Sequence, residues 1–183
     1  TGSAHGSATV ASPSPWGNGA ATPFRSDRGM PTPPSTHPRL VVVGNGMVGH
    51  RLLTELASLG ALDRLEVTVV GAERRAAYDR VALSSFFDGR SAEDLSMVEG
   101  EFFAAHGLDL VLGGEVVAID RAARAATTAS GRALPYDRLV LATGSYPFVP
   151  PLEGSDGPGC FVYRTIDDLE AIGQLCEARR IWL

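Results

Sequence analysis

The pattern of apolar and polar positions begins, after a polar N-terminal stretch, with alternating strand and helix signals. Residues 40–43 form an unbroken aliphatic run, which is typical of a strand buried on both faces in a parallel sheet. Apolar residues then recur at intervals of about four and predict an amphipathic helix over 48–59, ended by Gly60. A second β-rich run at 65–70 follows. The pattern therefore predicts strand, helix and strand in immediate succession.

Weaker signals follow in the middle of the chain. Residues 74–87 are neither regularly helical nor regularly β-like, and they indicate a loop that leads into a short helix. A helix is predicted over 101–106. Three β-type runs, at 108–112, 115–119 and 127–134, then predict a small antiparallel meander, and the third run contains a turn signal at Ser130-Gly131.

The meander is expected to cross over to another parallel strand, at residues 139–142. Residues 146–151 have no regular pattern, and Thr165 and Asp168 then have the spacing of a capping box that opens a last helix through Arg180. The order of the elements predicts an α/β, Rossmann-like fold, with a parallel sheet and an antiparallel β-meander as a crossover.

Glycines at positions 44, 46 and 49 join the first strand to the first helix. Gly44 lets the chain turn sharply, Gly46 lets the backbone approach a pyrophosphate, and Gly49 lets the helix pack tightly on the strand. The phosphates would meet the free N–H groups and the positive dipole end of the helix. The segment predicts a dinucleotide-binding turn, and the alternative is a glycine loop that only closes a turn.

An acidic residue follows the second strand. Glu73 lies slightly more than about 20 positions beyond the glycines, where a carboxylate accepts hydrogen bonds from an adenosine ribose. Strand, glycines, helix, strand and acid therefore occur in the order of a nucleotide-binding βαβ unit.

Length and charge limit the classes of function. The chain has 183 residues and a net charge of -5, so it can bury a core of single-domain size. Its acidic balance and its lack of a basic stripe argue against a nucleic-acid partner. No run approaches the ~18 consecutive apolar residues that span a bilayer, so we expect a soluble, cytoplasmic protein without a membrane partner.

The cysteines and histidines do not indicate a metal or disulfide centre. Cys160 and Cys176 are not in a CxxC or CxxxxC arrangement, and they are expected to be buried or partly buried free thiols. Two cysteines are too few to ligate an iron–sulfur cluster. The histidines lack metal-ligand spacing, and His50 is expected to be an ordinary helix residue. No metal site is predicted.

Residues 1–38 are rich in Ser, Thr, Ala, Gly and Pro and have no amphipathic period. Such a composition cannot offset its conformational entropy by burial, so this tail is predicted to be disordered. It lacks the apolar segment of a cleavable signal peptide. We therefore divide the chain into a tail, 1–38, and a folded domain, 39–183.

Four segments resemble the N-terminal part of the large subunits of NAD(P)H-dependent assimilatory nitrite reductases. They are GNGMVGHR at 44–51, AYDRV followed by LSS at 77–85, ATGSYP at 142–147 and CFVYRT at 160–165. The resemblance covers nearly everything outside the tail. These reductases belong to the superfamily of FAD-dependent pyridine nucleotide reductases, which also contains ferredoxin and rubredoxin reductases.

The resemblance implies that FAD, rather than NAD(P)H, occupies the first glycine turn. The glycines would contact its pyrophosphate, and Glu73 would contact its ribose. Arg80 and Ser84 would contact its flavin end. Val117 would contact the adenine through its backbone, and Arg164 would lie close to the isoalloxazine. An alternative for Arg80 is a solvated loop charge. The residues expected at the cofactor are Gly44, Gly46, Met47, Val48, Gly49, Glu73, Arg80, Ser84, Val117, Ala142, Thr143, Gly144 and Arg164.

The sequence departs from the complete enzymes of this family. It contains no second glycine motif for an NAD(P)H domain, no cysteine set for an iron–sulfur cluster and no basic residues for sirohaem. We expect NAD(P)H, sirohaem and the cluster only in a full-length enzyme, whose further domains or small subunit would be the partners. The FAD domain is expected to be incomplete at its C-terminal end and inactive alone. No catalytic acid, base or nucleophile is expected.

The sequence is therefore interpreted as the FAD-binding N-terminal portion of a flavin oxidoreductase that passes electrons from NAD(P)H through FAD toward nitrite. One alternative is an FAD protein like the ferredoxin or rubredoxin reductases. Another is a truncated, non-catalytic FAD-binding module. Ser85 stands where related ferredoxin reductases have Lys, and this favours the nitrite-reductase branch.

Overall fold

The structure is a computed structural model, and it describes residues 36–179. All described residues belong to one compact unit of the chain. The tail predicted over 1–38 lies almost wholly outside the described residues, so its disorder stays a prediction.

Four parallel strands form the main sheet, in the order β3-β2-β1-β7. In this sheet Val43 lies opposite both Val70 and Leu141, so three strands end at the same edge. The aliphatic runs at 40–43 and 65–70 are buried strands, as predicted. The strands are β1 (Arg39–Val43), β2 (Glu66–Val70), β3 (Asp109–Val111) and β7 (Arg138–Leu141).

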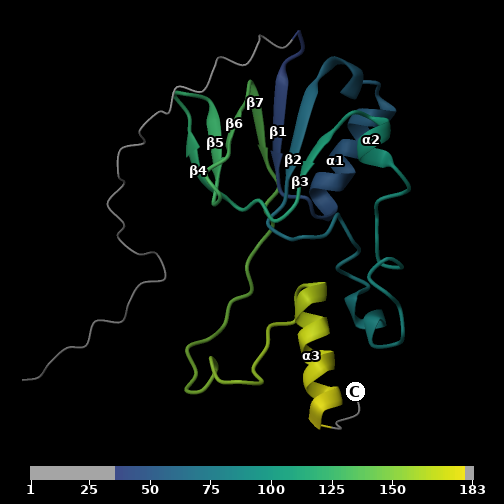
Figure 1. The fold of residues 1–183 in the computed structure, drawn as a ribbon, viewed down its shortest axis with the longest axis vertical. Helices are drawn as coiled ribbons and strands as arrows, with labels where there is room; N and C mark the ends of the chain where they lie inside the picture. The colour runs from purple at the N-terminus through teal and green to yellow at the C-terminus, as the bar shows by residue number, and fades with distance from the viewer. Residues whose placement is uncertain (1–35, 180–183) are drawn as a thin grey trace, which may run out of the picture. The chain divides into compact units, whose positions relative to one another are not determined.

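Helices α1 (Met47–Ser58) and α2 (Phe102–Ala105) cover one face of this sheet (Figure 1). Leu53 of α1 is fully buried and packs with Val42, Val67 and Val69 of the strands. The predicted helix over 48–59 is confirmed, and Gly60 follows it with φ +62°. A short 3-10 turn, Leu62–Arg64, leads on to β2.

Histidine 50 is an ordinary residue of α1, as expected. Its ring is buried and lies edge-on to the ring of Phe102, with 5.4 Å between the ring centroids. Its Nδ1 atom has no hydrogen-bond partner among the described residues. His50 thus belongs to the packing between α1 and α2.

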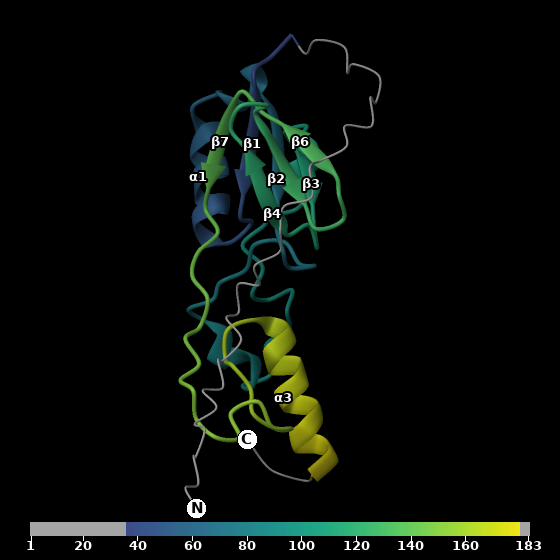
Figure 2. The same cartoon turned by 90° about the vertical axis from the view of Figure 1, so that its left-hand side faces the viewer.

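An antiparallel meander lies on the opposite face of the parallel sheet (Figure 2). It consists of β4 (Val116–Asp120), β5 (Ala125–Thr128) and β6 (Ala133–Pro135). Ala126 and Leu134 of the meander pack with Val41 of β1 in a second core cluster. The parallel sheet is therefore buried between helices and a meander.

The composition of the meander corrects two predictions. The run at 108–112 is not part of the meander, because β3 pairs with β2 at the edge of the parallel sheet. The connection from β2 to β3 contains helix α2, and a helical crossover of this kind brings the next strand back parallel to the previous one. The run at 127–134 contains two strands, which agrees with its turn signal at Ser130-Gly131, but β5 begins earlier than predicted, at Ala125. Ala125 and Ala126 have weak β propensity, so the sequence pattern did not indicate that the strand begins there.

Helix α3 (Ile166–Arg179) begins at the predicted capping box. The backbone N–H of Thr165 donates to Asp168 Oδ2 at 2.8 Å, and the N–H of Asp168 donates back to Thr165 Oγ1 at 3.1 Å. Ile166 and Leu169 bury their side chains in a third cluster with Tyr78. The extension of this helix to Arg180 lies outside the described residues.

The third cluster is completed by the loop after β2. Leu83 and Leu95 of this loop pack in the cluster, and Leu83–Phe86 forms the short helix that was predicted there, as a 3-10 turn. Arg75 forms ion pairs with Asp167 and Glu170 of α3. Apolar packing and ion pairs thus hold α3 to the loop after β2.

Within residues 36–179, no helix is long and apolar enough to cross a membrane. The same residues contain no group of three or more side chains placed to hold a metal ion. Both cysteines are free. Cys176 is partly buried as expected, but Cys160 is exposed, because it lies in the irregular segment that follows β7.

Candidate functional site

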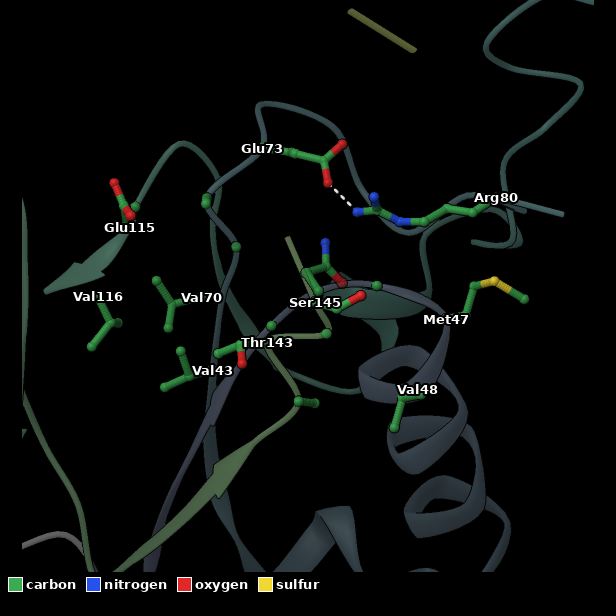
Figure 3. Close-up of a pocket in the computed structure, with 18 of the residues that line it drawn as sticks. Val43, Met47, Val48, Val70, Glu73, Arg80, Glu115, Val116, Thr143 and Ser145 are labelled. Carbon is green, nitrogen blue, oxygen red and sulfur yellow. Dashed lines mark hydrogen bonds and ion pairs between the residues drawn. The ribbon is translucent and has the colours of Figure 1, made fainter. Parts of the chain in front are cut away.

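A cavity of about 300 Å³ lies where β1, β2 and β7 end (Figure 3). Ligands of open α/β sheets bind at this edge, outside the carboxyl ends of the strands. The cavity is lined by the glycine turn, the loops after β2 and β7, the start of β4, and Arg164 just before α3.

The glycine turn is shaped by two close backbone approaches. Gly44 has φ +115°, and a Cβ atom there would lie 2.1 Å from the carbonyl oxygen of Ala142. A Cβ atom on Gly49 would lie 2.1 Å from the carbonyl oxygen of Gly44. Gly46 differs, because no atom lies within 4 Å of its Cβ position. Gly44 and Gly49 therefore set the packing, and Gly46 faces open space at the cavity.

The N-terminal end of α1 has the features of an anion-binding site. Gly46 is the N-cap residue, it supplies no side-chain cap, and the first turn contains no acidic residue. The N–H of His50 donates to the carbonyl oxygen of Gly46 at 2.9 Å, and the N–H groups before it have no partner within the helix. These N–H groups and the helix dipole favour a phosphate at this end.

Asn45 places an unpaired amide in the glycine turn. Its Oδ1 and Nδ2 atoms are both buried without a hydrogen-bond partner among residues 36–179. A Cβ atom on Gly71 would lie 3.0 Å from the Cβ of Asn45, so the side chain packs closely on the end of β2. Each buried polar group without a hydrogen bond lowers the stability of the fold by about 1–3 kcal/mol. The amide of Asn45 is therefore a polar group in the turn whose hydrogen bonds the described residues do not supply.

Glu73 is held by two side chains. The Tyr78 hydroxyl donates to Glu73 Oε2 at 2.6 Å, and Arg80 Nη2 donates to Glu73 Oε1 in an ion pair. Figure 3 shows Glu73 and Arg80 pointing toward one another, with the ion pair between them. Burial raises the pKa of the Tyr78 hydroxyl, and the hydrogen bond to Glu73 and its negative charge raise that pKa further. Tyr78 therefore remains a donor at neutral pH.

Arg80 also connects the site to the segment before α3. Its Nη1 donates to the carbonyl oxygen of Arg164 at 3.3 Å. The side chain of Arg164 reaches Gly144, whose Cβ position lies 3.6 Å from Arg164 Nη2. The interpretation of Arg80 as a solvated loop charge is wrong, since its side chain is only 27% exposed and makes these contacts.

Most of the residues predicted at the cofactor line this one cavity. They are Gly44, Gly46, Met47, Val48, Glu73, Arg80, Ala142, Thr143, Gly144 and Arg164.

The other three predicted residues do not line the cavity. They are Gly49, Ser84 and Val117. Gly49 lies beneath the turn, and Ser84 is exposed in the 3-10 turn. The ladder between β4 and β5 shifts its register between Val116 and Ala118, so Val117 is an irregular position, 59% exposed. The roles of Ser84 and Val117 at a cofactor stay predictions.

Sequence reasoning missed several residues of the cavity. Asn45 could have been found, because an amide between two motif glycines is next to any bound phosphate. Val116 could not, since only the register of β4 selects it over Val117. The residues missed are Val43, Asn45, Val70, Gly71, Ala72, Arg75, Gly114, Glu115, Val116, Ser145 and Tyr146.

The family comparison agrees with this geometry. Residues 38–181 match the profile of the pyridine nucleotide-disulphide oxidoreductases. The chain belongs to this family. It is therefore a member of an oxidoreductase family, and the glycine turn, the cavity and the parallel sheet all lie within the matched region.

Relatives in this family include nitrite reductases. The chain is 53% identical over 146 residues to the nitrite reductase [NAD(P)H] large subunit of Klebsiella oxytoca, covering 79% of this chain and 15% of that protein. It is 46% identical over 134 residues to the nitrite reductase (NADH) large subunit of Escherichia coli (strain K12), covering 73% and 16%. The chain thus spans about a sixth of the length of these relatives.

Two solved structures have the same fold. The crystal structure of the covalent putidaredoxin reductase-putidaredoxin complex matches with a TM-score of 0.67 and 31% identity, covering 75% of this chain and 34% of that chain. NADH:rubredoxin oxidoreductase from Clostridium acetobutylicum matches with a TM-score of 0.67 at 21% identity, covering 78% and 36%. The predicted Rossmann-like fold and the predicted resemblance to nitrite reductases are confirmed.

Proposed function

We propose that this chain forms the FAD-binding N-terminal part of a nitrite-reductase-type flavoprotein, which passes electrons from NAD(P)H through FAD toward nitrite. The similarity to two nitrite reductase large subunits over most of the chain supports this assignment. Sirohaem and an iron–sulfur cluster would belong to other parts of the full-length enzyme. Further domains or a small reductase subunit would be its partners, and it would act in the cytoplasm.

The observation that carries the proposal is that Gly46 and Glu73 line the same cavity. Gly46 leaves open space beside the unpaired N–H groups of α1, which suits a pyrophosphate. Glu73 lines the same cavity, which suits an adenosine ribose. A volume of about 300 Å³ is at the small end of ligand sites, and it suits the ADP half of the cofactor.

The described residues would bind and orient the cofactor. The N–H groups at the start of α1 would bind the pyrophosphate, and Glu73 would accept hydrogen bonds from the ribose. Arg80 and Arg164 would place positive charge on the flavin side of the cavity. FAD, when bound, would supply a flavin that can accept a hydride and pass electrons on one at a time.

A ferredoxin-reductase-like function is the second candidate. The structural match to putidaredoxin reductase favours it, because the fold is shared at 31% identity. Both candidates use the same FAD site. They differ in the electron acceptor, so a full-length protein that reduces an iron–sulfur carrier protein but not nitrite would select the second.

A titration with FAD tests the proposed function. We expect the 183-residue chain to bind one FAD, with quenching of the flavin fluorescence. Glu73→Ala should weaken FAD binding by roughly ten- to a hundredfold, because it removes a charged hydrogen-bond acceptor. Glu66→Ala is the control, since Glu66 is exposed at the other end of β2. Wild-type protein without measurable affinity for FAD would refute the proposal.

A further inference from the structure

Tyr78 is buried beside the cavity without being part of its lining. Its side chain is only 4% exposed, and its ring packs with Leu83, Leu95 and Ile166 in the third core cluster. Its backbone forms an isolated antiparallel bridge with Ser96. The position of the ring is therefore fixed by the core and not by the cavity.

The hydroxyl of this side chain binds the carboxylate of Glu73, which lines the cavity. It donates to Glu73 Oε2 at 2.6 Å, a short distance that is typical of a hydroxyl bound to a carboxylate. The guanidinium of Arg80 binds the other oxygen of Glu73 and lies over the Tyr78 ring, 5.3 Å from its centroid. The three side chains form one connected group.

Tyr78 and Arg80 each bind one carboxylate oxygen of Glu73, but they do not use all of its hydrogen-bond acceptor positions. A carboxylate has about four acceptor positions, and Tyr78 and Arg80 use one on each oxygen. Each oxygen therefore retains capacity for another donor. A vicinal diol, such as the 2′- and 3′-hydroxyls of a ribose, offers two such donors.

We propose that Tyr78 is a positioning residue, which fixes the carboxylate of Glu73 in the orientation that accepts the ribose hydroxyls of the bound cofactor. This inference rests on the proposed function, because it requires FAD in the cavity. Tyr78 does not touch the cofactor. It acts by anchoring one oxygen of Glu73 to the hydrophobic core, so that less orientational freedom is lost on binding.

Tyr78→Phe removes the hydroxyl and keeps the ring. We expect FAD to bind roughly tenfold more weakly, with the same loss for ADP, which contains the ribose but no flavin. Tyr136→Phe is the matched control, because Tyr136 is also buried but packs in the second cluster, and its affinity for FAD should stay within about twofold of wild type. Affinities are measured by fluorescence titration for FAD and by calorimetry for ADP.

The dependence on Glu73 separates positioning from general destabilisation. In a Glu73→Ala background, Tyr78→Phe should cause no further loss of FAD affinity, because the carboxylate that it positions is absent. Glu73→Asp tests the same idea without touching the core. It keeps the charge but withdraws it from Tyr78, and we expect it to weaken FAD by at least about fivefold.

Three results would overturn the inference. They are wild-type affinity in Tyr78→Phe, a loss that persists unchanged in the Glu73→Ala background, and wild-type affinity in Glu73→Asp. If Tyr78→Phe does not fold, wild-type affinity in Glu73→Asp still overturns the inference. Failure of the proposed function is distinguishable, because the wild-type protein itself would then bind neither FAD nor ADP.

Discussion

Gly49 of α1 lies against the carbonyl group of Gly44, so close that a Cβ atom on Gly49 would be 2.1 Å from the carbonyl oxygen. The neighbour is backbone at the end of β1, and it cannot move aside as a flexible side chain could. Gly49→Ala must therefore push the helix away from the turn. We expect it to lower the free energy of unfolding by about 1–3 kcal/mol, measured by urea denaturation.

Gly46→Ala provides the matched comparison in the same turn. Its Cβ atom would meet nothing within 4 Å, and its φ of -102° is compatible with any side chain. The free energy of unfolding should change by no more than about 0.5 kcal/mol. Equal destabilisation by the two substitutions would contradict the described packing of α1 on the strand.

Asn45→Leu should stabilise the protein in the absence of cofactor. The substitution removes two buried polar atoms that lack partners and replaces them with an apolar side chain of similar shape. We expect a gain of about 1 kcal/mol in the free energy of unfolding. Urea denaturation without FAD checks the prediction, and a loss of stability in Asn45→Leu would contradict it.

Asp137 should give the fold a stability that is lost in acid. Its Oδ2 accepts the backbone N–H of Arg39 at 2.8 Å and also its guanidinium Nε–H at 3.4 Å, and these interactions hold the pKa of Asp137 below its usual value. A carboxyl with a lowered folded-state pKa stabilises the fold above its unfolded pKa of about 4, and this contribution is lost as the pH falls through the folded pKa.

Asp137→Asn keeps an oxygen that can accept the Arg39 N–H but removes the charge. The wild type should have the higher melting temperature at pH 7, and the difference should shrink below about pH 4. Thermal melts of both proteins between about pH 7 and pH 2.5 measure the effect. A difference that is constant over this range would show that the charge of Asp137 does not contribute.

The first half of the fold could be predicted from sequence because its signals are local and agree with one another. The aliphatic strand at 40–43, the three motif glycines and the spacing of Glu73 specify a βαβ unit without long-range information. The capping box of Thr165 and Asp168 is also local, since both reciprocal hydrogen bonds lie within four residues.

The remaining features depend on long-range pairing. The run at 108–112 has the composition of any short strand, and only its pairing with β2 assigns it to the parallel sheet. The choice of Val116 over Val117 follows from an irregularity in the ladder between β4 and β5. Tyr78 was missed as a partner of Glu73, because the loop that contains it has no periodic pattern from which a side-chain direction could be inferred.

The most direct test of the central claim is to ask which half of the cofactor the glycine turn binds. ADP and FMN are titrated separately by calorimetry into the wild type and into Gly46→Val, whose side chain would fill the open space at the turn. We predict that ADP binds the wild type, that FMN binds it far more weakly, and that Gly46→Val abolishes the binding of ADP. Binding of FMN without ADP, or unchanged binding of ADP in Gly46→Val, would contradict the assignment of the turn to the pyrophosphate.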